Sequence, residues 1–291
     1  MSLNDLLVQP FADFGFMRRA LVAALALALG SAPMGTLLVL RRMSLVGDAT
    51  GHALLPGAAL GFLIAGPSLT AMSLGSFSAA VLVALAAGWV SRATAQREDA
   101  SFAAFYLIAL ALGVLLVSLR GGAVDLMHLL FGTILAVDDT ALILMCSVSS
   151  VTLLVLAAIY RPLVAECVDP GFLRSVGGPG RAVHGAMLVL TVANLVAGFQ
   201  AMGTLMSVGL MMLPAVAARF WAAQVWSLAA VAAVIAAFSG AAGLLLSYHA
   251  QWPSGPAIVL VAGGIYLVSL VAGSREGLLW QRLRRAHRTP A

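Results

Sequence analysis

Asp48 and His52 are the two residues of this sequence whose types and spacing are best suited to chemistry. They lie four residues apart in an apolar run over 44–66, so a helix would place them one turn apart on one face. A carboxylate and a neutral imidazole are good ligands for divalent zinc, manganese or iron. Ionisable residues are costly inside a membrane span and mark a pathway or site there. The other interpretation is an internal ion pair or hydrogen bond that holds two helices together.

Two ligands are too few for a stable metal site, because tetrahedral zinc takes four. A homodimer with its pathway on the two-fold axis would supply two Asp48 and two His52 side chains. A transporter also needs incomplete coordination, since an ion that is bound too well does not leave. Ser44 and Thr50 are near enough in sequence to orient the imidazole.

The composition indicates a membrane protein. Of 291 residues, 62% are hydrophobic and 9% are charged, whereas soluble domains carry roughly 25% charged residues. At about 20 apolar residues per crossing, the chain has material for eight or nine spans. We therefore expect an all-α polytopic membrane helical bundle with eight or nine transmembrane helices, forming a single domain over 1–291.

All 16 basic residues are arginine. A P-loop needs a lysine to reach the nucleotide phosphates. We therefore expect that this chain is not an enzyme. If ATP is used, we expect a separate partner chain to hydrolyse it. The arginines are scattered singly or in pairs between apolar runs, which suits membrane topology better than a nucleic-acid surface. The basic tail over 274–291 could contact anionic membrane lipid.

The hydropathy pattern divides the chain into spans joined by short polar segments. A short amphipathic segment over 1–16 comes first, 120–140 is only moderately apolar and could form an amphipathic or re-entrant helix, and 161–181 is the longest polar loop. Two spans share 182–219, which predicts a broken or tightly turned pair around Gly198–Gly203. The expected spans are about 19–40, 44–66, 70–90, 101–119, 141–160, two within 182–219, 224–248 and 257–273.

The arginines also predict which side of the membrane each loop faces. The arginine-bearing segments fall on alternate turns, so all of them can be cytoplasmic together. The N-terminus would then lie outside, where Arg18 and Arg19 break the rule; either the N-terminal segment lies along the membrane surface or the span count differs by one. The segments assigned to the cytoplasm are 41–43, 91–100, 161–181, the end at Arg219 and the tail.

Other polar residues have weaker claims to a role in transport. Asn194 and Gln200 would line the pathway or make hydrogen bonds between helices. Met202 belongs to a methionine cluster that would suit copper(I) but is also ordinary packing material.

Three residues are candidates for metal access from outside, although a role as interfacial polar side chains explains them better. Asp125 and His128 have i, i+3 spacing, and His249 lies beside two aromatic residues. We expect His184 and His287, which lie near basic segments, to be solvated.

A short helix is expected within 161–181. Asp169 is a good N-cap and Pro170 suits the first helical position. A capped helix in a cytoplasmic loop is a feature that a partner protein could bind.

Six segments together resemble one family of membrane proteins, although Asp169-Pro-Gly-Phe-Leu and Thr50-Gly51 depart from its usual residues. The segments are Pro10-Phe11 with Phe16-Met-Arg-Arg-Ala20, Arg42 through Gly57, Leu130 through Leu135, Asp169-Pro170 followed by Gly177, Gly203 through Arg219, and Gly243 with Ser247-Tyr248 and Pro253-Ser-Gly255. In these segments, and over nearly its whole length, the chain resembles the membrane permease subunit of ATP-binding-cassette importers for zinc, manganese or iron (the zinc and manganese uptake permease family).

The resemblance implies a multi-pass protein of a bacterial plasma (inner) membrane that imports a divalent transition metal. It implies a homodimer of permeases, a cytoplasmic ATP-binding-cassette ATPase and an extracytoplasmic metal-binding protein. Asp48 and His52 would hold the transported Zn²⁺ or Mn²⁺, with zinc favoured and no permanently bound cofactor. Asp169, Pro170 and Gly177 would couple the permease to the ATPase.

Two other functions fit parts of the sequence. An ion-coupled secondary metal transporter is the main alternative, but such proteins often show inverted repeats, and none is evident. An intramembrane metalloenzyme would need an acid or base near the pair, and the sequence has no His-Glu-x-x-His motif.

Overall fold

The computed structural model describes residues 8–43, 45–66, 68–94, 96–118, 137–275 and 277–280. Every regular element in these residues is a helix, which confirms the all-α prediction. The helices are α2 (Gln9–Asp13), α3 (Gly15–Leu40), α4 (Val46–Ala65), α5 (Leu69–Ala93), α6 (Glu98–Ser118), α8 (Asp139–Val168), α9 (Pro170–Ser175), α10 (Gly180–Met202), α11 (Thr204–Ala218), α12 (Val225–Ala250) and α13 (Ser254–Ala272).

Seven helices in the described part of the chain are long and apolar enough to cross a membrane: α3, α5, α6, α8, α10, α12 and α13. Two shorter apolar helices, α4 and α11, accompany them, with apolar stretches over Ala49–Ala65 and Thr204–Ala218. The bundle therefore agrees with the expectation of eight or nine membrane helices. Most of 120–140 lies outside the described residues.

The break expected within 182–219 lies at Gly203. This residue has a φ of 87°, which favours glycine, and it separates α10 from α11. The expected loop over 161–181 is shorter than predicted, because α8 continues to Val168. Leu163 and Glu166, one turn apart, are both buried against the bundle, so tertiary packing extends the helix beyond the apolar run.

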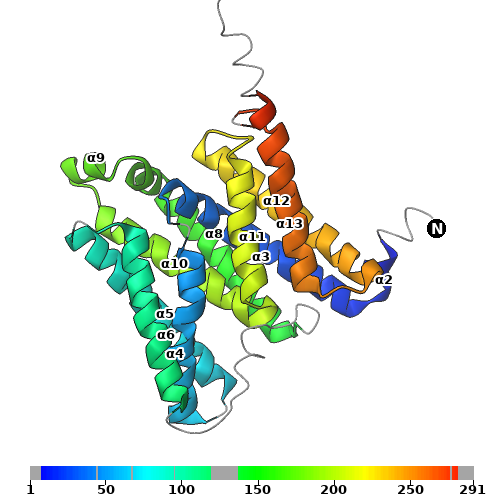
Figure 1. Ribbon diagram of the computed structural model, residues 1–291, viewed down its shortest axis with the longest axis horizontal. Helices are drawn as coiled ribbons and strands as arrows, with labels where there is room; N and C mark the ends of the chain where they lie inside the picture. Colours follow the sequence, from blue (N-terminus) through cyan, green and yellow to red (C-terminus); the bar gives the residue numbers. More distant parts are fainter. Residues whose placement is uncertain are drawn as a thin grey trace, which may run out of the picture.

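The bundle is built around α3 and α10, whose apolar spans are the most deeply buried. In Figure 1, α4, α5 and α6 stand together on one side of the molecule, and α12 and α13 stand on the other. Helix α4 packs mainly on α5 and α6, and α11 packs between α3, α12 and α13. The start of α4, which carries Asp48 and His52, also contacts α6, α10 and α11.

Glycines allow α4 and α5 to approach each other very closely. A Cβ atom added to Gly57 on α4 would collide with the backbone of Gly75 on α5, and the reverse also holds. Gly61 lies in the same way against the backbone of Ala71. Small residues permit such close packing of helices in lipid, so the position of α4 depends on this glycine contact.

One end of the bundle gathers the arginines and is called the arginine-rich end below. Contacts between Arg41, Arg92, Glu98, Glu166 and His184 bring the ends of α3, α5 and α8 and the starts of α6 and α10 together there. Helix α9 lies at this end, on the upper side of Figure 1.

The opposite end of the bundle is defined by contacts near the N-terminus. The Arg19 guanidinium lies 3.3 Å from the Asp139 carboxylate at the start of α8, and the rings of Phe14 and Tyr248 are 5.8 Å apart. The start of α3 is thus remote from α9. Arg19, one of the two arginines that break the charge rule, has an acidic partner there.

Candidate metal-binding site

Asp48 and His52 lie in the first two turns of α4. The helix places their Cα atoms one turn apart on one face, as the spacing predicts. The side chain of Asp48 lies outside what the structure describes, and so does Ser44. The geometry of the site is therefore built from His52 and from the residues that surround α4.

The imidazole of His52 is partly buried and stacks on the phenol ring of Tyr106 on α6. The ring centroids are 5.6 Å apart and the planes are inclined by 26°. Such stacked pairs of rings stabilise by about 0.5–1.5 kcal/mol beyond the burial of their area. Tyr106 therefore restricts the orientation of the imidazole, and sequence reasoning gave no reason to select it.

Glycines form the adjoining face of this part of α4. A Cβ atom on Gly47 would lie 3.1 Å from Val208 Cγ1 of α11, and one on Gly51 would lie 3.7 Å from Phe199 Cζ of α10. Thr50 donates its hydroxyl hydrogen to the carbonyl oxygen of Val46, 2.6 Å away within the same helix. That hydroxyl bond serves the helix backbone, whereas Tyr106 is the described neighbour that contacts the imidazole ring.

Among the described side chains, no group of three or more His, Cys, Asp and Glu residues is close enough to hold a metal ion. The ligand set that this part of the chain offers is therefore His52 together with the carboxylate expected from Asp48. A site that is built from these two residues alone provides half of a tetrahedral ligand set.

The three residues considered for the pathway have different settings. Asn194 on α10 is fully buried and donates from Nδ2 to Thr152 Oγ1 at 2.7 Å and to the Leu190 carbonyl at 2.8 Å. Gln200, near the end of α10, is exposed, and Met202, its last residue, is buried. Asn194 thus makes the hydrogen bond between α10 and α8 that was considered as its alternative role.

Of the three residues considered for metal access, Asp125 and His128 lie outside the described residues. His249 is exposed near the end of α12, and its ring meets the Tyr248 ring edge-on at 5.2 Å. It lies at the opposite end of the bundle from α9, next to the contact between Tyr248 and Phe14.

Helix α9 has the capped start that the sequence predicts. The Asp169 carboxylate accepts a hydrogen bond from the Phe172 N–H at 2.9 Å, and Pro170 occupies the first helical position. Gly177 ends the helix with a φ of 71°. The Gly178 N–H donates to the Leu173 carbonyl at 2.8 Å, and the Gly177 N–H donates to Arg174 at 3.1 Å. These bonds form a Schellman motif, in which glycine at the left-handed position avoids strain.

The two faces of α9 differ in burial. Leu173 is buried against the bundle, whereas Phe172 and Val176 are 59% and 60% exposed. Exposed apolar side chains on a short helix at the end of a bundle are suited to contact with another protein.

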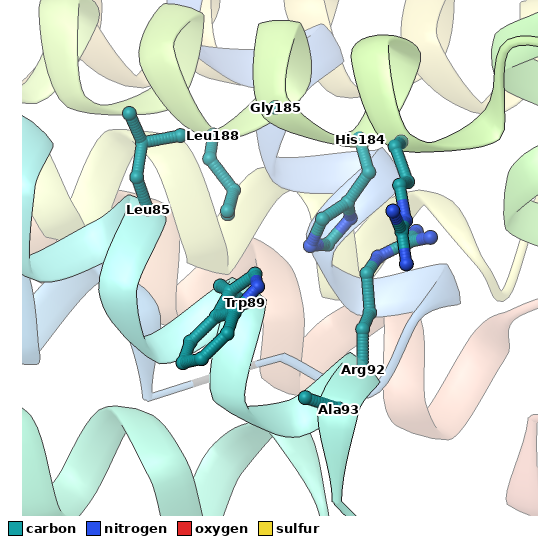
Figure 2. Close-up of a pocket in the computed structure, with 9 residues that line it drawn as sticks. Leu85, Trp89, Arg92, Ala93, His184, Gly185 and Leu188 are labelled. Atoms are coloured by element: carbon teal, nitrogen blue, oxygen red, sulfur yellow. The ribbon is translucent and has the colours of Figure 1, made fainter.

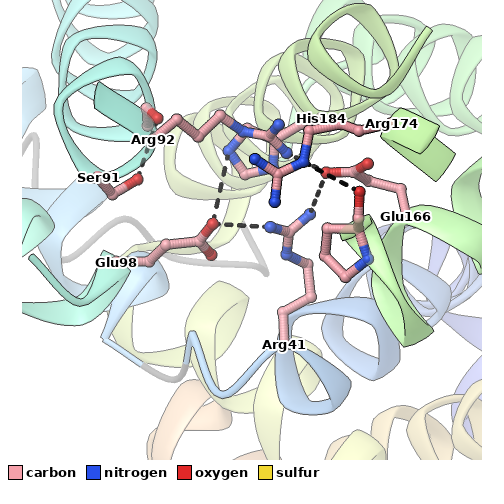
Figure 3. A network of polar contacts seen from close by, with 9 residues as sticks. Arg41, Ser91, Arg92, Glu98, Glu166, Arg174 and His184 are labelled. Atoms are coloured by element: carbon pink, nitrogen blue, oxygen red, sulfur yellow. Dashed lines mark hydrogen bonds and ion pairs between the residues drawn. The ribbon is translucent and has the colours of Figure 1, made fainter. Parts of the chain in front are cut away.

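A network of charged side chains lies beside α9, between five helix ends (Figure 3). Arg41 Nη2 is 2.7 Å from Glu98 Oε1, and Arg41 Nη1 is 3.5 Å from Glu166 Oε1. Arg92 Nη2 also binds Glu166 Oε1, and His184 Nε2 is 4.0 Å from Glu98. The Glu166 side chain is 0% exposed and the Arg41 side chain is 8% exposed. We call these five residues the charge network.

The charge network was not foreseen from the sequence. Its arginines had been assigned to solvated loops, and Glu166 had been placed in the polar loop. The expectation of a solvated His184 is wrong, because its side chain is 4% exposed and lies between α5 and α10. Figure 2 shows it near Trp89 and Arg92, along a groove of about 190 Å³ that Leu85 and Leu188 line on the apolar side.

Comparison with known proteins identifies the family. The ABC 3 transport family matches residues 13–273. The chain belongs to this family. The ATP-binding-cassette permease resemblance of the sequence is thereby confirmed, and the chain is a multi-pass bacterial membrane protein.

The chain is also similar in sequence or structure to individual proteins with named functions. The chain is 30% identical over 268 residues to the manganese transport system membrane protein MntC of Halalkalibacterium halodurans, covering 92% of this chain and 90% of that protein. It is 30% identical over 269 residues to the chelated iron transport system membrane protein YfeD of Yersinia pestis, covering 92% and 89%. A solved structure of PsaBC from Streptococcus pneumoniae with a Fab has 27% identity and a TM-score of 0.80, and covers 97% of this chain and 100% of that chain.

Proposed function

We propose that this family member is the membrane permease of an ATP-driven importer of a divalent transition metal. The observation that carries the proposal is the family match over residues 13–273. The named relatives are membrane proteins of manganese and chelated iron transport systems. Membership of an ATP-binding-cassette family favours an ATP-driven importer over the ion-coupled secondary transporter.

The proposed transport site is Asp48 with His52. Their place at the start of α4, one turn apart and near α6, α10 and α11, supports a site between helices. A carboxylate and an imidazole offer one hard oxygen and one borderline nitrogen to a divalent ion. Two copies of the permease on a two-fold axis would complete four ligands, so a homodimer is part of the proposal.

Manganese is the first cargo to test. The sequence favoured zinc only because a dimer would supply four ligands; manganese prefers six, and water would fill its remaining positions. The relatives are named for manganese and iron. We therefore place manganese ahead of zinc, with ferrous iron as the third candidate. Gln200 and Met202 for the pathway, and Asp125, His128 and His249 for outer access, remain secondary proposals.

The proposed partners lie on opposite sides of the membrane. By the positive-inside rule, the arginine-rich end is the cytoplasmic side. Helix α9 lies at this end and is therefore the proposed contact with the ATPase. The exposed Phe172 and Val176, together with the cap at Asp169-Pro170 and the turn at Gly177, support this contact. A metal-binding protein would dock at the opposite end.

Uptake into vesicles tests the proposal. The permease is reconstituted with its ATPase and metal-binding protein, and uptake of radiolabelled manganese, zinc and iron is measured with and without ATP. We expect ATP-dependent uptake that Asp48→Ala or His52→Ala abolishes while assembly with the ATPase persists. Thr70→Ala, an exposed change at the start of α5, serves as the control. Uptake at the unmodified rate in either site variant would overturn the site assignment, and no uptake of any metal would overturn the function.

A second arm tests the role of α9. Asp169→Arg removes the cap and reverses a charge on the proposed contact surface. We expect loss of ATPase binding in a pull-down assay, or loss of stimulated hydrolysis. Normal recovery together with normal hydrolysis would contradict the assignment of α9 to the ATPase.

A further inference from the structure

Glu166 lies near the end of α8, three residues before the Asp169 that caps α9. Only Asp169 separates α8 from α9. A displacement of α9 is therefore passed to the last turn of α8, which contains Glu166. The Glu166 carboxylate contacts the ends of three other elements. Its Oε1 binds Arg41 after α3 and Arg92 on α5, and a Cβ atom added to Gly180 at the start of α10 would lie 2.6 Å from its Oε2.

Arg41 links the Glu166 carboxylate to residues near the start of α4. It also binds Glu98 at 2.7 Å, and the adjacent Asp99 carboxylate lies next to the backbone N–H of Leu45, the residue before α4. The first turn of α6 thus lies beside Arg41, which follows α3, and Leu45, which precedes α4. His52 lies less than two turns further along α4.

The α3–α4 connection is also tightly folded. Arg42 has a φ of 58°, and the Met43 N–H donates to the Leu38 carbonyl at 2.9 Å across it. Leu38 and Met43 are both fully buried, which is the apolar contact that accompanies a Schellman turn. These bonds hold Arg42 and Met43 to the end of α3, and the Val46 N–H donates to the Met43 carbonyl at 3.4 Å, so a movement of Arg41 reaches the start of α4 through Met43.

We infer that Glu166 and Arg41 are the positioning residues through which α9 moves the metal-binding end of α4. This inference rests on the function proposed above. A buried ion pair resists separation, because pulling it apart leaves charges uncompensated in a low dielectric. The pair therefore transmits a displacement that a contact between apolar side chains would absorb by sliding.

The charge network also holds the means to change its pairing. In the described part of the chain, Glu166 Oε2, Arg92 Nε and both ring nitrogens of His184 are buried without a hydrogen-bond partner. Grooves of about 840 and 480 Å³, both lined by Arg41, Glu98 and Pro170, flank the network. Pro170 at the start of α9 lines both grooves, and the unpaired donors and acceptors beside it offer other partners to the charges of the network.

The test compares ATP hydrolysis with metal uptake in the full assembly of permease, ATPase and metal-binding protein, using manganese as the probe. Glu166→Gln keeps the size of the side chain and removes its charge. We expect the metal imported per ATP hydrolysed to fall at least about fivefold, a typical lower bound for coupling between two sites, while the permease still binds the ATPase.

A second variant guards against a folding defect. Arg41→Met/Glu166→Leu removes the two most buried charges together, so neither is left unpaired in the bundle. Arg92 and Glu98 keep opposite charges and are each about a fifth exposed. The matched control is Arg19→Met/Asp139→Leu, which removes an exposed pair at the opposite end. We expect the metal imported per ATP hydrolysed to fall in the double variant and to stay unchanged in the control.

The outcomes separate this inference from the proposed function. An unmodified assembly that imports no metal overturns the proposed function. If the unmodified assembly imports metal and both network variants import as much metal per ATP hydrolysed as it does, only the inference is overturned. If Glu166→Gln fails to assemble and the double variant couples normally, the network only stabilises the fold, and the inference is also overturned.

Discussion

The imidazole ring of His52 lies against the phenol ring of Tyr106, with centroids 5.6 Å apart and planes inclined by 26°. This contact joins the candidate ligand on α4 to α6, a helix that contributes no candidate ligand among its described residues. An imidazole whose orientation is fixed before the ion arrives loses less freedom on binding it. Tyr106 is therefore expected to influence metal binding without touching the ion.

Tyr106→Leu should weaken uptake at limiting metal, whereas Tyr106→Phe should preserve it because the ring remains. A loss of about 0.5–1.5 kcal/mol corresponds to a roughly 2- to 10-fold lower uptake rate below saturation. Initial rates over a range of manganese concentrations measure the effect. Tyr160→Leu, a change on α8, is the control. Equal rates for the Leu and Phe variants would contradict the orienting role.

Gly57→Ala should destabilise the permease, because the added methyl group meets the backbone of α5. Forcing extra atoms into a packed contact costs about 1–3 kcal/mol. Thermal unfolding in detergent should show a lower midpoint temperature than for the unmodified protein. Gly263→Ala on α13, where a Cβ atom would meet nothing within 4 Å, is the matched control. It should leave the midpoint unchanged or raise it, since alanine favours a helix by roughly 0.5–1 kcal/mol over glycine.

Gly177→Ala should weaken binding of the ATPase more than Gly177→Asn. The φ of 71° at this residue costs an ordinary side chain about 1–2 kcal/mol, and asparagine tolerates it better. The end of α9 would shift or fray, which displaces the exposed Val176. Affinity of the purified permease for the ATPase measures the difference. An alanine variant that binds as tightly as the glycine parent would show that the turn is not part of the contact.

Asn194→Ala should lower stability and spare transport. The change removes the hydrogen bond from Nδ2 to Thr152 between α10 and α8. Such bonds between membrane helices contribute about 0.6 kcal/mol on average and up to ~1.7 kcal/mol. Thermal unfolding and vesicle uptake are measured on the same preparation. The reverse pattern, with full stability and lost uptake, would favour a pathway role for Asn194.

Local sequence signals predicted much of the fold. Runs of about 20 apolar residues mark the long helices because each must satisfy its own backbone inside lipid. The break at Gly203 and the cap at Asp169 were predictable for the same local reason, since glycine, aspartate and proline fix backbone geometry over a few residues. The pairing of Asp48 with His52 on one face of α4 needed only helical spacing.

The charge network could not be predicted in this way. Glu166 meets Arg92 across 74 residues of sequence, and Arg41 meets Glu98 across 57. Each residue taken alone looks like a solvated charge at a helix end. Its burial follows from the packing of five helix ends, which no periodicity records. The contact of Tyr106 with His52 has the same origin, because it depends on how α4 and α6 lie against each other.

The two helices with the shortest apolar stretches, α4 and α11, adjoin each other where Gly47 faces Val208. The 15 residues of α11 span roughly 22 Å at 1.5 Å each, which is less than the ~30 Å of a typical hydrocarbon core. Lipid near a short helix thins to match it. Where α11 adjoins α4, an ion that travels along α4 therefore crosses a narrower low-dielectric layer, with a lower electrostatic self-energy, than an ion beside the 30-residue helix α8 would cross.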